Sequence, residues 1–374
     1  MSGSATVRLR PDVALALRGQ ACLALRPFRA GCDACAAACP SQVLRVAPGA
    51  VTLAPGCLAC GRCVAACPTG ALSVGGFVKS PAAGASSAIE CDRVPHKARR
   101  AGALTVTCSG GLTVGHFLQL QAKAGATDVV VLDRGWCASC PAGGEGGHPA
   151  AAAVAEAAAI VAEAGGTGRP RLDGAPLPAR KAQPLAPEDV AVDAGRRRLF
   201  GPALGLEEPE APAHDLRAPL EAPERARRLD AARRLSAGGA VPPRLLPEVT
   251  ISRGCRDHRI CAHVCPTRAL AVREDGALVF TAETCIACGR CATTCPSGAI
   301  TVEARRSTAG GHPAPEPVLL RRASTRVCAA CGSDFQEYPD GTDDGLCPEC
   351  RKERGLMRDA WGIGVVSQPR EFAE

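Results

Sequence analysis

Two cysteine runs with the spacing C-x2-C-x2-C-x3-C-P contain the residues of this chain that are best placed to do chemistry. The runs are Cys57, Cys60, Cys63, Cys67 and Cys285, Cys288, Cys291, Cys295. In such a run three thiolates bind one [4Fe–4S] cluster and the fourth binds a neighbouring cluster. The spacing therefore predicts a protein that carries iron–sulfur clusters, whose chemistry is the transfer of single electrons.

An eight-residue pattern begins at the last cysteine of each cysteine group and occurs four times. Every copy starts with Cys-Pro, continues with Ser or Thr and ends with Val, and the copies are 39–46, 67–74, 265–272 and 295–302. The prolines would cap short helices, and the aliphatic residues after them would form short strands. Two pairs of copies predict two similar modules, over residues 1–80 and 249–305.

The first module has one regular and one irregular ligand set. The regular set is Cys39, Cys57, Cys60 and Cys63. The irregular set has three evident members, Cys32, Cys35 and Cys67. Arg29 occupies the position where its first cysteine is expected, so we predict that Cys22 is the fourth ligand and that residues 23–31 loop out. The alternative is a three-cysteine cluster beside a buried Cys22, which would leave a free thiol exposed to oxidation.

The second module repeats this organisation. Its regular set is Cys265, Cys285, Cys288 and Cys291, and its other set is Cys255, His258, Cys261 and Cys295. Either the imidazole of His258 ligates iron, which would raise the reduction potential, or the position is empty and the site holds a [3Fe–4S] cluster. Asp257 could also reach the fourth iron, and a solvated His258 is the remaining alternative.

Both modules resemble bacterial dicluster [4Fe–4S] ferredoxins. The resemblance covers residues 22–74, where it departs at Arg29, and residues 254–302. It implies two small two-fold repeated folds, each with two clusters held by interleaved ligands, and four [4Fe–4S] clusters in the chain. One or two of these are expected as [3Fe–4S] if the irregular sets lack a ligand.

Residues 81–165 predict a small α/β domain. Two apolar strands, 103–108 and 128–133, flank a helix over 114–124 that Thr113 caps, and a second helix follows over 149–164. A strand, a helix and a strand at this length form a βαβ unit. Its sites lie at the carboxyl ends of the strands. We therefore expect three thiols to converge there, those of Cys108, Cys137 and Cys140.

The residues Cys108-Ser109-Gly110-Gly111-Leu112 and the cysteines after 129–131 resemble the small iron–sulfur delta subunit of methyl-viologen-reducing hydrogenases. That subunit works beside heterodisulfide reductase. The chain lacks that family's preceding cysteine pair, for which Cys91 is an uncertain substitute. The resemblance implies a [2Fe–2S] cluster here. A redox-active or zinc-binding pair, Cys137 and Cys140, and a structural thiol pair are the alternatives.

Two C-x2-C knuckles lie near the C-terminus, in residues 320–355. Their members are Cys328, Cys331, Cys347 and Cys350. Knuckles at this separation predict a zinc ribbon with four protein ligands and no catalytic position. A rubredoxin-like iron site has the same knuckles.

Residues 166–248 contain no cysteine and are rich in Pro, Ala, Arg and Glu, so we predict a largely extended linker. Two short helices interrupt it, over 187–200 and 223–235. Its basic groups are interpreted as solvated faces, with an acidic docking partner as the alternative: Arg196, Arg197, Arg198, Arg225, Arg227 and Arg228.

Composition limits the class of protein. The chain has 374 residues, only 3% of them aromatic, so metal ligation must supply part of its folding energy. The formal charge of +7 counts 23 cysteines as neutral, and four clusters of about −2 each would cancel it, so it does not indicate nucleic-acid binding. Cysteine spacing and the absence of a long apolar run predict a reduced, cytoplasmic protein with no membrane insertion.

The predicted fold class is α+β: two ferredoxin-like 2[4Fe–4S] modules that flank a small α/β segment and a linker, with a C-terminal zinc ribbon. We expect an electron-transfer subunit without its own substrate site, and redox partners of hydrogenase, formate dehydrogenase or heterodisulfide reductase type. The rivals are an iron–sulfur assembly or maturation factor, a redox sensor, and an enzyme whose active site is built from Cys108, Cys137 and Cys140.

Overall fold

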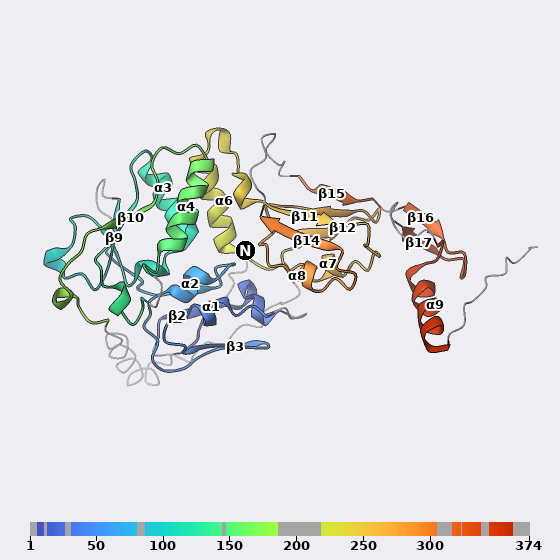
Figure 1. Cartoon of the computed structure of the whole chain (residues 1–374), viewed down its shortest axis with the longest axis horizontal. Helices are drawn as coiled ribbons and strands as arrows, with labels where there is room; N and C mark the ends of the chain where they lie inside the picture. Colours follow the sequence, from blue (N-terminus) through green and yellow to red (C-terminus); the bar gives the residue numbers. More distant parts are fainter. Residues whose placement is uncertain are drawn as a thin grey trace, which may run out of the picture. The chain divides into compact units, whose positions relative to one another are not determined.

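The computed structural model describes residues 6–10, 13–26, 31–80, 87–143, 147–185, 218–304, 316–322, 324–337 and 344–361. These residues mix helices and sheets and form two compact units (Figure 1). The first unit comprises residues 1–247 with 283–286 and 304–314, and the second comprises 248–282, 287–303 and 315–374. Among the described residues, no helix is long and apolar enough to cross a membrane.

The N-terminal part of the first unit is built from short strands and single helical turns. Its antiparallel sheet has the order β1-β2-β5, and a separate hairpin pairs β3 with β4. The elements are β1 Thr6–Arg8, β2 Leu15–Arg18, η1 Gly19–Ala21, η2 Leu23–Leu25, α1 Ala34–Ala37, β3 Leu44–Ala47, β4 Ala50–Leu53, α2 Arg62–Ala66 and β5 Leu72–Val74. The strands predicted after the first two Cys-Pro pairs are thus present as β3 and β5.

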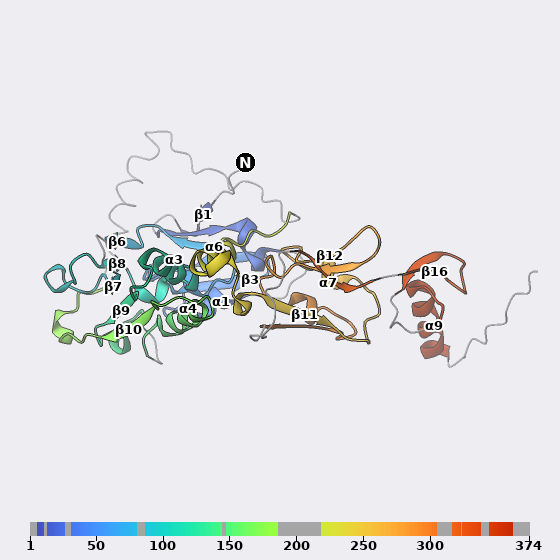
Figure 2. The same cartoon turned by 90° about the horizontal axis from the view of Figure 1, so that it is seen from above.

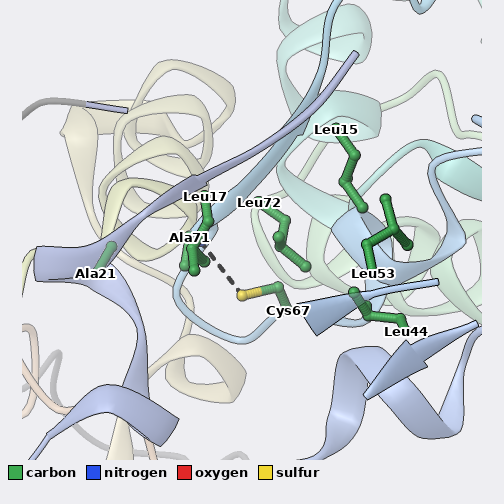
Figure 3. Close-up of a cluster of buried hydrophobic side chains, with 8 residues drawn as sticks. All are labelled: Leu15, Leu17, Ala21, Leu44, Leu53, Cys67, Ala71 and Leu72. Atoms are coloured by element: carbon green, nitrogen blue, oxygen red, sulfur yellow. Dashed lines mark hydrogen bonds between the residues drawn. The ribbon is translucent and has the colours of Figure 1, made fainter. Parts of the chain in front are cut away.

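A small apolar core lies inside this part of the unit (Figure 3). Strand β2 alternates buried and half-buried residues, so that Leu15 and Leu17 point inward, where they meet Leu44, Leu53 and Leu72. The core is small because cysteines take positions that aliphatic side chains would otherwise fill, and Cys67 is one of its buried members. What is bound by these cysteines therefore contributes to folding as well as to function.

The middle of the first unit contains a five-stranded sheet of order β10-β9-β7-β8-β6. Strands β7 to β10 pair in parallel, whereas β6 pairs with β8 in antiparallel fashion. The elements are β6 Val78–Ser80, β7 Ala88–Cys91, η3 His96–Ala98, β8 Leu104–Val106, η4 Ser109–Gly111, α3 Val114–Ala124, β9 Val130–Asp133, η5 Cys137–Ser139, α4 Ala151–Glu163, β10 Arg171–Gly174 and η6 Ala179–Lys181.

Both helices predicted for this segment are confirmed, and α3 begins at its Thr113 cap, whose hydroxyl accepts from the His116 N–H. The predicted strand–helix–strand unit is also present, but strand β7 lies between β8 and β9. Sequence patterning missed β7 because Glu90 interrupts its apolar run. Glu90 is nevertheless fully buried, and its carboxylate accepts from Arg134 and from the Arg100 N–H, both at 2.8 Å.

Part of the stretch predicted as a linker is ordered. Strand β10 extends the sheet, and helix α6, Pro223–Leu235, packs beside α3 and α4 (Figures 1 and 2). Two single turns follow α6, η8 Ala237–Gly239 and η9 Pro243–Leu245. The helix predicted over 223–235 is thereby confirmed, whereas the one predicted over 187–200, with Arg196, Arg197 and Arg198, lies outside the described residues.

Glu224 explains why α6 is held in place. Its buried carboxylate accepts from the Thr113 hydroxyl at 2.8 Å and from the Gly115 N–H at 2.9 Å. Arg227 and Arg228 form ion pairs with the same carboxylate. The interpretation of these two arginines as solvated groups is therefore wrong, because a buried carboxylate must be paired.

The second unit repeats the same short elements. Strand β11 pairs with β14, while β12, β13 and β15 form an antiparallel sheet of three strands, and β16 and β17 form a hairpin. The elements are β11 Pro247–Ile251, α7 Ile260–His263, β12 Leu270–Val272, β13 Leu278–Phe280, α8 Arg290–Thr293, β14 Ile300–Ala304, β15 Val318–Arg321, β16 Ser324–Val327, β17 Asp334–Glu337 and α9 Pro348–Trp361. The strands predicted after the other two Cys-Pro pairs are β12 and β14.

Replacing Glu224 should loosen α6 from α3. Glu224→Gln leaves two arginines near a neutral group, and breaking a buried ion pair of this kind costs about 3 to 5 kcal/mol. Hydrogen exchange of the α6 amides should show this loss in the free energy of local opening. Glu221→Gln is the matched control, because Glu221 is half-exposed and pairs loosely with Arg18 at 3.5 Å. Equal protection of α6 in both variants would contradict the assigned role of Glu224.

Candidate metal centres

The four Cys-Pro copies adopt one backbone conformation. The fourth residue of each copy has a left-handed φ: 54° at Gln42, 76° at Gly70, 55° at Arg268 and 58° at Gly298. This turn brings backbone N–H groups to the cysteine sulfur, as when the Ala71 N–H lies 3.2 Å from the Cys67 Sγ (Figure 3). The repeated sequence thus forms a repeated turn, which can direct backbone N–H groups toward a cysteine sulfur.

Hydroxyl groups reinforce the same turns. The Thr69 and Ser297 hydroxyl oxygens lie 3.4 Å and 3.5 Å from the Sγ atoms of Cys67 and Cys295. Burial acts to raise the pKa of Cys295, but the Ser297 hydroxyl and backbone N–H groups outweigh it and lower that pKa. In these two copies the hydroxyl at the third position therefore stabilises the thiolate form.

The cysteines of the irregular set of the first module share one apolar pocket. Its wall includes Cys22, Cys32, Cys35 and Cys67. Cys22 ends the η1 turn and Cys67 ends helix α2, so residues far apart in sequence meet here. The structure brings the thiol of Cys22 to the three others, which is the arrangement that the irregular set requires.

A second pocket of the first module contains the four cysteines of the regular set. They are Cys39, Cys57, Cys60 and Cys63. The first cysteine comes from one Cys-Pro copy and the other three from the following run. The two pockets therefore take their cysteines in the interleaved manner of a two-cluster site.

Neither pocket favours thiolates by itself. Burial, followed by the neighbouring cysteines, raises the pKa of Cys35 to about 12, and the same causes raise the pKa of Cys63. Burial also raises the pKa of Cys22, although backbone N–H groups oppose it. Thiol groups in such surroundings ionise only when a cation shares the site, so the donor set fits a bound metal cluster.

The second unit brings together part of its predicted ligand sets. Burial raises the pKa of Cys261 to about 11, and the negative charges of Cys255 and Cys295 add to the effect. Burial and the charge of Cys265 act in the same direction on Cys288, whose pKa is raised. Cys261 thus lies near two members of its predicted set, and Cys288 lies near one member of its own. Residues 283–286, which include Cys285, group with the first unit.

His258 occupies the backbone position of a cluster cysteine. In the regular runs the second cysteine follows a residue with φ of 49° or 51°, Ala59 or Ala287, and precedes a glycine with positive φ. Around His258 the same two positions have φ of 51° and 55°, although they are Asp257 and Arg259. The His258 side chain is exposed. The Asp257 carboxylate lies 3.3 Å from the Arg259 guanidinium, an ion pair that competes with ligation by Asp257.

Four cysteines converge at the carboxyl ends of parallel strands in the middle sheet. Cys91 ends β7, Cys108 follows β8, and Cys137 and Cys140 follow β9; all four line one pocket with Trp136 and His148. Burial raises the pKa of Cys108 and of Cys137 to about 12. Neighbouring cysteines add to the shift at both residues, and the Asp133 carboxylate adds to it at Cys137. A cation bound among these sulfurs would remove that penalty, so the donor set fits a metal or a cluster.

Sequence reasoning missed the side chains that complete this pocket. Asp133, Cys137 and His148 present ligand atoms within 4.8 Å of one another. The position of Asp133 at the end of β9 is a sequence signal that could have predicted it, because sites lie at the carboxyl ends of strands. His148 comes from the segment before α4, where no sequence pattern indicated a ligand. Cys91, an uncertain member in the sequence, reaches the pocket because β7 lies between β8 and β9.

The C-terminal cysteines form a tight group in the second unit. The Sγ atoms of Cys328, Cys331, Cys347 and Cys350 lie within 4.8 Å of one another. Four thiolates around one tetrahedral zinc ion have Sγ atoms about 3.8 Å apart, and the Cys331 and Cys347 Sγ atoms are separated by 3.8 Å. Burial opposes ionisation of Cys328, but backbone N–H groups outweigh it and lower its pKa to about 6. This group fits a single ion.

Two family models match the chain. The 4Fe-4S dicluster domain model matches residues 30–72, and the LdpA Fe-S cluster-binding domain model matches residues 255–306. No curated protein and no solved structure gives a significant match. The chain is therefore an iron–sulfur protein with a ferredoxin-like domain. All 23 cysteines lie within the described residues, and none of them forms a disulfide there.

The C-terminal group should bind one zinc ion independently of iron. Cys331→Ser should lower zinc to well below one ion per chain and leave iron unchanged, because no iron–sulfur pocket uses this residue. Elemental analysis of protein purified without oxygen measures both metals. Ala330→Ser, which changes an exposed side chain inside the same knuckle, is the control and should retain zinc. A parallel fall of iron would show that the group is an iron site.

Proposed function

We propose that the chain is an electron-transfer protein that relays single electrons between partner oxidoreductases through iron–sulfur clusters. The observation that carries the proposal is the pair of interleaved cysteine pockets in the first module. Interleaved ligands hold two clusters close together, which suits the passage of electrons and serves no purpose in a single isolated site. The repeated Cys-Pro turns support the same use of the second module.

Each module would hold two clusters. The regular sets are Cys39, Cys57, Cys60, Cys63 and Cys265, Cys285, Cys288, Cys291. The irregular sets are Cys22, Cys32, Cys35, Cys67 and Cys255, His258, Cys261, Cys295. Four [4Fe–4S] clusters result, with [3Fe–4S] where the irregular fourth ligand is absent. The donors of the first module come from strands and turns that share one core, so the clusters and the fold stabilise each other.

The middle pocket would hold a [2Fe–2S] cluster. Its proposed ligands are Cys91, Cys108, Cys137 and Cys140. The convergence of four thiols at one sheet edge supports four-thiolate ligation over a redox pair made of Cys137 and Cys140 alone. The C-terminal knuckles would hold structural zinc. The resemblance of the middle segment to a hydrogenase subunit favours hydrogenase, formate dehydrogenase or heterodisulfide reductase as the type of partner, in the cytoplasm.

Iron counting tests the ligand role of Cys22. The wild-type chain should contain about 16 to 18 iron atoms, and Cys22→Ser should lose about one of them. Electron paramagnetic resonance (EPR) of the oxidised variant should then show a [3Fe–4S] signal. Gln20→Ser changes a neighbouring side chain of the same turn and should keep the wild-type iron content. An unchanged iron content in Cys22→Ser would refute ligation, and about 8 iron atoms or fewer in wild type would refute the four-cluster relay.

Replacing His258 by cysteine tests the second irregular site. If imidazole ligates iron, His258→Cys adds a thiolate charge and should lower the reduction potential of that cluster at constant iron. His258→Ala should give a [3Fe–4S] signal. Redox titration followed by EPR measures both effects, with His263→Ala as the control on an exposed histidine of α7. If His258 is solvated, the alanine variant will match wild type.

A further inference from the structure

The regular site of the first module and the middle pocket touch each other. Cys60, from the regular set, and Cys108, from the middle pocket, are buried in one cluster with Ala142, and Leu58 and Cys140 pack against it. Cys60 is 7% exposed and Cys108 is 8% exposed. The contact is therefore dry, and it joins one proposed ligand of each site.

Two glycines permit this approach. A Cβ atom on Gly111 would lie 2.6 Å from the Cys60 carbonyl oxygen and 2.6 Å from the Phe77 ring. A Cβ atom on Gly61 would lie 2.8 Å from the Phe77 ring and 3.1 Å from the Gly111 Cα. Both Gly111 distances are below the 3.0 Å that real Cβ atoms keep, so a side chain at Gly111 would force the Cys60 loop or the Phe77 ring to shift. Gly61 also has a φ of 75°, which further favours glycine.

A hydrogen-bonded side chain fastens the same contact. Arg62, between Cys60 and Cys63, donates from its Nη1 to the carbonyl oxygens of Ala142 and Gly143, at 3.2 Å and 2.7 Å. These carbonyls belong to the second and third residues after Cys140. Arg62 thus ties the loop of one site to the loop of the other, and its charge adds strength to both bonds.

We propose that Gly61, Gly111 and Arg62 form an electron-transfer junction that holds the middle pocket against the Cys60 site. This inference rests on the proposed function. Iron–sulfur groups at the two sites supply one-electron chemistry, in which one is oxidised and the other reduced by one electron with no bond made or broken. Within the first unit, the Cys60 set shares a buried contact with the middle pocket, and cysteines of the Cys22 set and of the Cys60 set pack around the same apolar core.

The spin interaction between the two sites tests the junction in the full-length chain, reconstituted with iron and sulfide and then reduced. In wild type the EPR signal of the [2Fe–2S] cluster proposed for the middle pocket should itself show splitting or faster spin relaxation, which coupling between the two clusters inside a module cannot cause. Cys137→Ser combined with Cys140→Ser should abolish this interaction together with the iron of the pocket. Gly111→Val should weaken the interaction at unchanged iron content. Gly174→Val is the matched control, because a Cβ there meets no atom within 4 Å, and it should match wild type.

A second variant covers the case in which Gly111→Val loses iron. Arg62→Met removes both hydrogen bonds without adding a side chain to the contact, and it should also weaken the interaction. Complete iron in wild type with an unsplit, slowly relaxing signal from the pocket cluster would overturn the junction and leave the proposed relay intact. Loss of the first-module clusters in wild type would instead refute the proposed function.

Discussion

Every cysteine pocket of the first unit must hold several thiol groups away from water, and the rest of that unit depends on how this is made tolerable. Desolvation and repulsion from neighbouring negative groups raise the pKa values of Cys35, Cys108 and Cys137 to about 12, so the protein surroundings alone favour neutral thiols. A positively charged metal centre reverses this preference. Ligand binding and folding are therefore one process, which suits a chain with few aromatic residues and small apolar cores.

The Cys-Pro turns act on the same electrostatic balance from the protein side. In the copies that begin at Cys67, Cys265 and Cys295, main-chain N–H groups point toward the cysteine sulfur, and a hydroxyl oxygen lies within 3.9 Å of it. Hydrogen bonds to a thiolate stabilise its charge and raise the reduction potential of the cluster that it binds. Because the turn is repeated, differences between sites must come from ligand identity and local burial, which vary at Cys22 and His258.

Helix α6 links the ligand turns of the first module to the α/β sheet. The Glu224 N–H donates to the Thr69 carbonyl oxygen at 3.1 Å, while the Glu224 carboxylate caps the start of α3. One residue thus contacts both the turn after Cys67 and the helix that follows the Cys108 loop. Burial alone would raise the pKa of Glu224, but Arg228 and the hydrogen bonds outweigh it and lower that pKa. The carboxylate consequently stays charged and keeps its partners.

The sequence by itself determined the chemistry and the local elements. Cysteine spacing identified the cluster-binding modules, and caps and periodicity located α3, α4 and α6, because these signals depend on residues close together in the chain. Only the tertiary structure decided which distant residues meet. Glu90 can be buried because Arg134, from beyond strand β9, pairs with it. Glu224 can be buried because Thr113 and Gly115 of the α3 start donate to it and two arginines of its own helix pair with it. The meeting of Cys22 with Cys67, the place of Cys91 and the contact of Gly61 with Gly111 depend on packing, which local patterns do not encode.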